Sequence, residues 1–262
     1  MRDFSTLQDP ARLALACLDL TSLNDGDDAA AVTALCARAL GPAGPPAAVC
    51  VWPRFVAQAR AALPARIRVA AVANFPDGAT DVARAVADAR AIVAAGGDEV
   101  DLVLPWRALQ AGDAASAAAA VAAVVAAVRA AGPGRTVKLI LESGDLDTPT
   151  LIRRASKIGL DAGVDFLKTS TGKTNTGATL DAARVMLQAI ADHPRGAAVG
   201  FKASGGVRSV ADAMVYIDLV KTLLGSAALA PARFRIGASG LLNDIEAVLG
   251  VAAVPGSTQR DY

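Results

Sequence analysis

The chain has 262 residues, of which 53% are hydrophobic and 19% are charged, and its formal net charge is +1. A charge this close to zero argues against a nucleic-acid or membrane-surface binder, because such proteins carry a marked excess of basic residues. The length matches the roughly 250 residues of a (β/α)8 barrel.

The cysteines and the N-terminus favour a cytoplasmic protein. Cys17, Cys36 and Cys50 are odd in number, lack CxxC spacing and lie in apolar stretches, so we expect reduced thiols. Residues 1–4 lack the apolar run of a signal peptide. The alanine- and valine-rich run 114–128 is too short for a membrane span, and Asp113 is placed to cap it as a helix.

Short apolar runs alternate with helical patterns along the whole chain. The strand candidates are rich in Val, Ile and Leu without strict alternation, which is typical of a parallel sheet covered on both faces. They span residues 13–18, 47–51, 68–73, 99–104, 137–141, 165–168, 198–201 and 234–236. Helices are expected near 28–40, 54–62, 79–95, 113–131, 147–162, 179–192, 208–224 and 240–249.

Eight successive βα units predict an α/β protein with a closed (β/α)8 TIM barrel. No linker divides the chain, so we expect one domain over residues 1–262, with a short N-terminal extension and a flexible C-terminal tail at about 255–262. An open doubly wound sheet is the alternative. It lacks support from a Rossmann fingerprint, because Gly96-Gly97 follows a helical pattern rather than preceding one.

Active sites of such barrels lie at the carboxyl ends of the strands, where two lysines fall on neighbouring strands. Lys168 ends the sixth expected strand, and Lys202 directly follows the seventh. Ammonium groups about 5 Å apart repel by ~3 kcal/mol at an effective dielectric near 20, or roughly two pKa units. Partial desolvation would lower the pKa further, so Lys168 is a candidate nucleophile tuned by Lys202. The alternative is that both lysines are ordinary ion-pair members bridged by a carboxylate.

Asp101 is a carboxylate among aliphatic residues on the fourth strand. Even-numbered strands share interior layers, so we expect Asp101 to face the same pocket as Lys168. Its predicted role is proton transfer through a bound water. The same carboxylate could also hold the lysines in place by its charge, and the two roles are compatible. Glu99, one layer lower, is expected to pair with Lys138 as a structural ion pair.

Glycine-containing loops after strands 6, 7 and 8 predict an anion site. The motifs are Gly172-Lys173, Gly205-Gly206 and Gly237-Ala238-Ser239, and the last opens a helix. Unobstructed backbone N–H groups and a helix N-terminus favour a phosphate. Metal chemistry has little support, since the single histidine, His193, precedes a proline in a predicted loop.

At these residues the chain resembles the deoxyribose-phosphate aldolases, class I aldolases built on a (β/α)8 barrel. The match runs from about Leu15 to the C-terminus and rests on residues 19–24, 50–55, 74–76, 98–101, 166–172, 200–208 and 234–239. The resemblance implies reversible cleavage of 2-deoxy-D-ribose 5-phosphate to acetaldehyde and D-glyceraldehyde 3-phosphate, in deoxynucleoside catabolism and without a cofactor. Its expected partners are thus a phosphosugar and an aldehyde, with no nucleic acid or membrane. A homodimer is a candidate assembly that the sequence leaves open.

The resemblance also implies roles for individual residues. Lys168 would form the Schiff base, Lys202 would tune it and Asp101 would work in the proton relay. Further expected site residues are Thr171, Gly172, Lys173, Gly205, Gly206, Gly237 and Ser239 for the phosphate, with Asp19, Thr21 and Tyr262 as auxiliaries.

The chain departs from its relatives at Gly240, where many have a second serine, so one phosphate hydrogen bond is in doubt. Tyr262 is expected to fold over the pocket, with a frayed terminus as the alternative. Two other functions stay open: a Schiff-base aldolase or transaldolase acting on another phosphosugar, and a non-catalytic phosphosugar-binding barrel.

Overall fold

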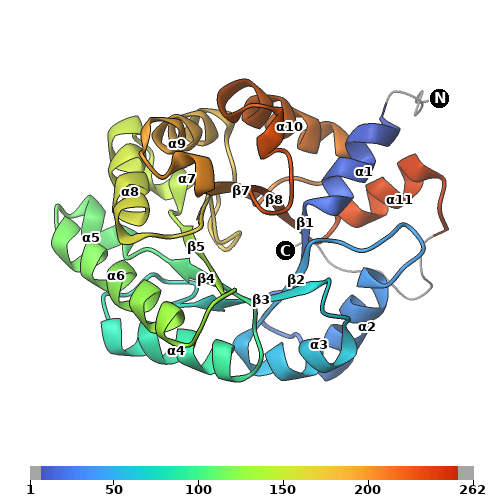
Figure 1. The fold of residues 1–262 in the computed structure, drawn as a ribbon, viewed down its shortest axis with the longest axis horizontal. Coiled ribbons are helices and arrows are strands. Elements are labelled where there is room, and N and C mark those ends of the chain that lie inside the picture. Colours follow the sequence, from blue (N-terminus) through green and yellow to red (C-terminus); the bar gives the residue numbers. More distant parts are fainter. Residues whose placement is uncertain (1–6, 253–262) are drawn as a thin grey trace.

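A computed structural model describes residues 7–252, and a closed barrel of parallel strands forms its centre (Figure 1). Each strand pairs with the next along the chain, and β8 closes the ring on β1. The predicted (β/α)8 barrel is confirmed. The strands are β1 (Leu18–Thr21), β2 (Ala48–Val51), β3 (Arg68–Ala73), β4 (Glu99–Val103), β5 (Thr136–Ile140), β6 (Phe166–Lys168), β7 (Gly200–Ser204) and β8 (Phe234–Ala238).

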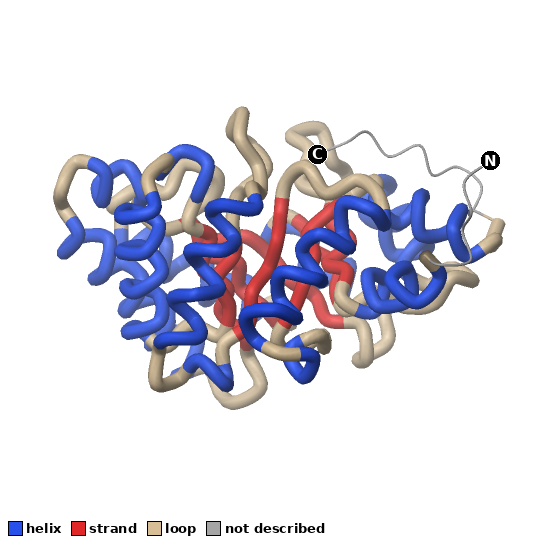
Figure 2. Tube along the Cα trace, turned by 90° about the horizontal axis from the view of Figure 1, so that it is seen from above, coloured by secondary structure: helices blue, strands red, loops and turns tan. Residues whose placement is uncertain are grey.

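Helices surround the strands on the outside of the barrel (Figures 1 and 2). They are α1 (Gln8–Ala16), α2 (Ala29–Ala39), α3 (Val56–Ala62), α4 (Val82–Ala94), α5 (Trp106–Gln110), α6 (Ala114–Ala130), α7 (Ser143–Leu146), α8 (Pro149–Ala162), α9 (Leu180–Asp192), α10 (Val210–Leu224) and α11 (Leu241–Leu249). Short 3-10 turns occupy Pro53–Phe55, Gly196–Ala198 and Ser226–Ala228. Asp113 caps the alanine-rich α6 as expected, accepting a hydrogen bond from the Ser116 N–H. Within residues 7–252, none of the helices is long and apolar enough to cross a membrane.

The first predicted strand, 13–18, is wrong. Those residues mostly belong to α1, whose buried side chains include Ala11, Ala14 and Leu15. This spacing of three and four residues forms one face of a helix, and a short apolar run cannot distinguish that face from a buried strand. The first strand instead begins at Leu18.

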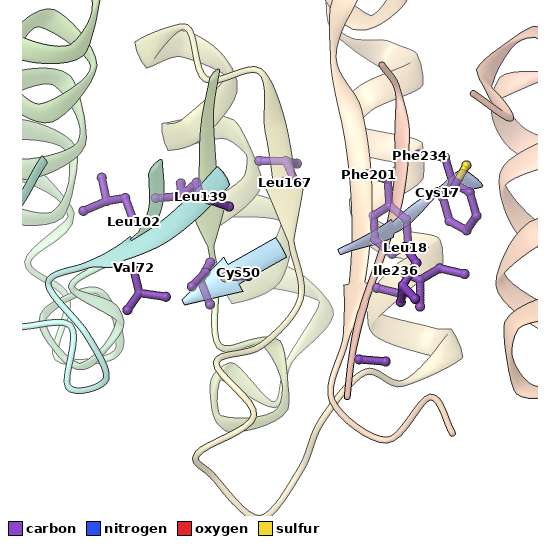
Figure 3. Close-up of a cluster of buried hydrophobic side chains, with 14 of the residues drawn as sticks. Cys17, Leu18, Cys50, Val72, Leu102, Leu139, Leu167, Phe201, Phe234 and Ile236 are labelled. Carbon is purple, nitrogen blue, oxygen red and sulfur yellow. The ribbon is translucent and has the colours of Figure 1, made fainter. Parts of the chain in front are cut away.

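The strands carry apolar side chains on their outer face. Leu102, Leu139 and Leu167 belong to the buried apolar cluster shown in Figure 3. A Cβ added at Gly159 of α8 would lie 2.7 Å from Cδ2 of Leu139 and 3.1 Å from Cδ2 of Leu167, so these leucines face the helices. Successive side chains of a strand point to opposite faces, so the strand neighbours of these leucines point toward the barrel axis.

Candidate active site

Charged side chains fill the centre of the barrel, where branched aliphatic residues are usual. They are Asp19 on β1, Glu99 and Asp101 on β4, Lys138 on β5, Lys168 on β6, Lys202 on β7 and Arg235 on β8. Each is at most 5% exposed to solvent. Buried charges are costly unless they are paired, so the geometry of the pairing determines what the cluster can do.

Asp101 is the point where the three lysines meet. Its Oδ2 atom accepts hydrogen bonds from Nζ of Lys168 at 3.0 Å and Nζ of Lys202 at 2.8 Å. Its Oδ1 atom accepts from Nζ of Lys138 at 2.7 Å. The structure therefore brings together the three residues to which the sequence assigned the chemistry, with the two strand-end lysines sharing one carboxylate oxygen.

Two further carboxylates complete the network. Asp19 accepts from Nζ of Lys202 at 2.5 Å and from Nη1 of Arg235 at 2.6 Å. Glu99 lies 2.5 Å from Nζ of Lys138, so the expected structural pair is confirmed, and it also accepts from Nη2 of Arg235 at 2.8 Å. Sequence analysis missed Arg235 and the bond between Lys138 and Asp101. Arg235 has a signal in the sequence, because it lies two positions before Gly237 and so faces the axis with that residue.

The charges of this network balance when one amine is neutral. The three carboxylates are offset by Lys138, Lys202 and Arg235. A protonated Lys168 would add a fourth positive charge without a matching carboxylate in the network. An unmatched buried charge is strongly unfavourable, so charge balance favours the free amine at Lys168.

The pKa values of the two strand-end lysines shift in opposite directions. Burial lowers the pKa of Lys168 most, the charge of Lys202 lowers it further, and Asp101 opposes both effects. Burial also acts to lower the pKa of Lys202, but Asp101 and Asp19 outweigh it and hold that pKa above its ordinary value. The lowered pKa of Lys168 has the direction that the sequence predicts. The order of causes differs, because desolvation exceeds the lysine–lysine repulsion that the sequence analysis put first.

The loops after β7 and β8 enclose a small polar pocket, the glycine pocket. Residues 205–208 and 237–240 line it, which includes the predicted Gly205, Gly206, Gly237 and Ser239. Gly205 and Gly206 have φ angles of 86° and 87°, a region that favours glycine. A Cβ at Gly237 would lie 2.9 Å from Cε of Lys202, so this glycine also makes room for the lysine.

Other predicted phosphate residues have different neighbours. The Thr171 hydroxyl donates to Oε2 of Glu142 at 2.5 Å. Nζ of Lys173 lies 3.1 Å from Oδ1 of Asp25 and 5.9 Å from the ring centroid of Trp52. Neither Thr171 nor Lys173 lines the glycine pocket.

The auxiliary residues have separate outcomes. Asp19 is part of the charge network, and the Thr21 hydroxyl donates to the Asp19 backbone oxygen at 2.8 Å. Tyr262 and the expected flexible tail lie outside the described residues. Cys50 is fully buried, and burial raises the pKa of its thiol to about 11, so it is a poor nucleophile at neutral pH.

Comparisons with known proteins show the family of the chain. The family model for DeoC/LacD family aldolases matches residues 13–245. The chain belongs to this family. The aldolase is also 47% identical over 244 residues to a deoxyribose-phosphate aldolase from Agrobacterium fabrum, covering 92% of each chain.

Solved structures share the fold of this aldolase. A protein from Toxoplasma gondii ME49, assigned as a deoxyribose-phosphate aldolase, is 25% identical with a TM-score of 0.83, and the match covers 94% of this chain and 95% of that one. A tetrameric deoxyribose phosphate aldolase from Aeropyrum pernix is 22% identical with a TM-score of 0.71, covering 93% and 95%, and supports the fold alone. The aldolase is thus a lyase.

Proposed function

We propose that this aldolase reversibly cleaves 2-deoxy-D-ribose 5-phosphate into acetaldehyde and D-glyceraldehyde 3-phosphate through a Schiff base on Lys168. The observation that carries the proposal is the buried pair of Lys168 and Lys202 on one oxygen of Asp101. In this arrangement the surrounding charges balance without a proton on Lys168, so its amine can attack a carbonyl.

The reaction uses this amine in each of its covalent steps. The Lys168 nitrogen attacks carbon 1 of the open-chain sugar, and loss of water from the carbinolamine leaves a protonated imine. Removal of the proton from the carbon-3 hydroxyl then breaks the bond between carbons 2 and 3, and the electron pair moves toward the iminium nitrogen. D-Glyceraldehyde 3-phosphate leaves, and carbon 2 of the enamine accepts a proton. Hydrolysis of the new imine releases acetaldehyde and restores the amine.

Asp101 and Lys202 manage protons beside the Schiff base. Asp101 contacts both lysines, and its pKa is held well below its ordinary value because the attraction of the three lysines outweighs its burial. The carboxylate therefore stays ionised and relays protons through a bound water rather than storing one. Lys202 remains cationic between Asp101 and Asp19 and supplies the positive charge that keeps Lys168 neutral.

The glycine pocket holds the phosphate. Gly205, Gly206, Gly237 and Ser239 line it, and α11 begins immediately after Gly240, so backbone N–H groups and a helix N-terminus face an anion. Holding the far end of a short sugar in this pocket fixes its carbon 1 near Lys168.

The assembly and compartment complete the proposal. Cys17, Cys36 and Cys50 are buried free thiols, which supports a reducing, cytoplasmic environment. A homodimer is the proposed assembly, and light scattering coupled to gel filtration would distinguish it from a monomer or from a tetramer like that of the Aeropyrum relative.

Trapping the imine tests the proposed function. Borohydride reduction with acetaldehyde should leave an ethyl group on Lys168, located by peptide mass mapping and absent in Lys168→Leu. The exposed Lys157, paired with Asp161 on α8, provides the matched control, and Lys157→Leu should keep the adduct. An adduct on another lysine, or faster cleavage of 2-keto sugar phosphates than of 2-deoxyribose 5-phosphate, would overturn the proposal.

A further inference from the structure

The loop after β6 connects Lys168 to the glycine pocket, which is the proposed phosphate pocket. It leaves the strand at Thr169, directly after Lys168, and Thr169 bonds to β7: its N–H donates to the Lys202 oxygen at 3.1 Å, and its hydroxyl donates to the Ser204 oxygen at 3.0 Å. The loop returns at Ala178, whose N–H donates to the Gly205 oxygen at 3.0 Å. Both ends of the loop are therefore held by the strand that carries Lys202 and leads into the pocket.

The middle of the loop is held from the opposite side by Glu142, at the end of β5. Its carboxylate accepts from the Thr171 N–H at 3.1 Å and from the Thr171 hydroxyl at 2.5 Å. The next residue, Ser143, donates its N–H to the Thr169 oxygen at 2.9 Å. Three hydrogen bonds thus join the β5 end to Thr169 and Thr171 of the loop.

Glu142 occupies an unusual position for this purpose. The residue is fully buried, and its φ angle of 55° lies in the left-handed region that non-glycine residues rarely adopt. Such strained backbone persists where the surrounding structure requires it, and it is concentrated at functional sites. This left-handed residue carries the carboxylate that accepts from Thr171.

Fixing Thr171 also fixes the glycine that touches the phosphate pocket. Gly172 follows Thr171, and a Cβ added at Gly205 would lie 3.8 Å from its Cα and 3.0 Å from that of Gly177. The loop therefore lies in contact with Gly205, and a shift at Thr171 would move the wall of the pocket relative to Lys168. A hydroxyl has one proton to donate, and the Thr171 hydroxyl donates it to Glu142.

We propose that Glu142 is a positioning residue that acts through Thr171 to set the distance between the Schiff-base nitrogen and the phosphate pocket. This inference rests on the proposed function. Glu142 makes phosphate binding productive: when the clamp formed by Glu142 and Thr171 is intact, a phosphate in the pocket places carbon 1 of the sugar at Lys168. Without the clamp, the phosphorylated substrate loses its advantage over unphosphorylated 2-deoxyribose.

The test measures phosphate preference, defined as the ratio of kcat/KM on 2-deoxyribose 5-phosphate to that on 2-deoxyribose. Thr171→Val keeps the shape of the side chain but removes the hydroxyl, and the preference should fall at least tenfold. Thr171→Ser restores the hydroxyl and should recover most of the preference. Glu142→Asn tolerates the left-handed backbone but is too short to reach Thr171, so it should reproduce the loss.

The double variant Glu142→Asn/Thr171→Val should lose no more preference than Thr171→Val alone, because both changes break one clamp. Wild-type preference in Glu142→Asn would overturn the inference and would assign Thr171 to direct phosphate binding. Additive losses in the double variant would overturn it as well. Thermal melting and trapping of acetaldehyde on Lys168 are measured for every variant. Failure of the wild-type chain to trap acetaldehyde would instead overturn the proposed function.

Discussion

Removing the charge of Lys202 tests the electrostatic core of the mechanism. In Lys202→Leu, the three buried carboxylates keep only Lys138 and Arg235 as permanent cations, so protonation of Lys168 now restores the balance. We therefore expect the pKa of Lys168 to rise and its free amine to become scarce at neutral pH.

The size of this effect follows from the shared oxygen of Asp101. The amines of Lys168 and Lys202 lie 3.0 and 2.8 Å from that atom, so they are within about 6 Å of each other. Their repulsion at an effective dielectric of 20 is ~3 kcal/mol, or roughly two pKa units. The fraction of unprotonated Lys168, and with it kcat/KM at pH 7, should fall at least about tenfold and at most about a hundredfold.

The assay is the pH dependence of cleavage of 2-deoxyribose 5-phosphate. The deficit should be largest where both amines are protonated, and it should shrink toward alkaline conditions because the amine of the variant then loses its proton as well. Lys157→Leu, which removes an exposed lysine, should follow the wild-type profile. An equal deficit at pH 7 and pH 9, or full activity in a folded Lys202→Leu chain, would refute the electrostatic argument.

Two further predictions concern the ion network and the phosphate pocket. Lys138→Met removes the buried cation that Glu99 and Asp101 share, which leaves the network one positive charge short, and we expect a loss of about 3–5 kcal/mol in unfolding free energy, measured by urea titration. A loss below about 1 kcal/mol would mean that the network relaxes freely. Gly205→Ala places a Cβ 3.0 Å from the Cα of Gly177 at a φ of 86°, so the KM for the phosphosugar should rise about tenfold, on the order of 1.4 kcal/mol. An unchanged KM in steady-state kinetics would exclude a close fit of the phosphate at this loop.

The order of βα units and the residues at the strand ends were readable from sequence because they depend on local patterns. Runs of Val, Ile and Leu identified seven of the eight strands close to their observed positions, although β7 begins two residues later than expected, so that Lys202 lies in its middle rather than after its end. Lys168 does end β6, as expected. The first strand failed because the apolar run before Leu18 also fits one face of α1. That ambiguity is local, and only the packing of the barrel resolves it.

Sequence by itself determined the barrel, the pair of lysines and the acidic partner, because each follows from residue types at spacings that the fold repeats. Tertiary structure alone decided which oxygens join which nitrogens. Arg235 meets Asp19 across 216 positions of the chain, and no local pattern reports such a contact. The same holds for Thr171, whose hydroxyl turns to Glu142 on the neighbouring strand end. The physical reason is that the charge on a buried group depends on the sum of all groups around it, and only closure of the barrel brings those groups together.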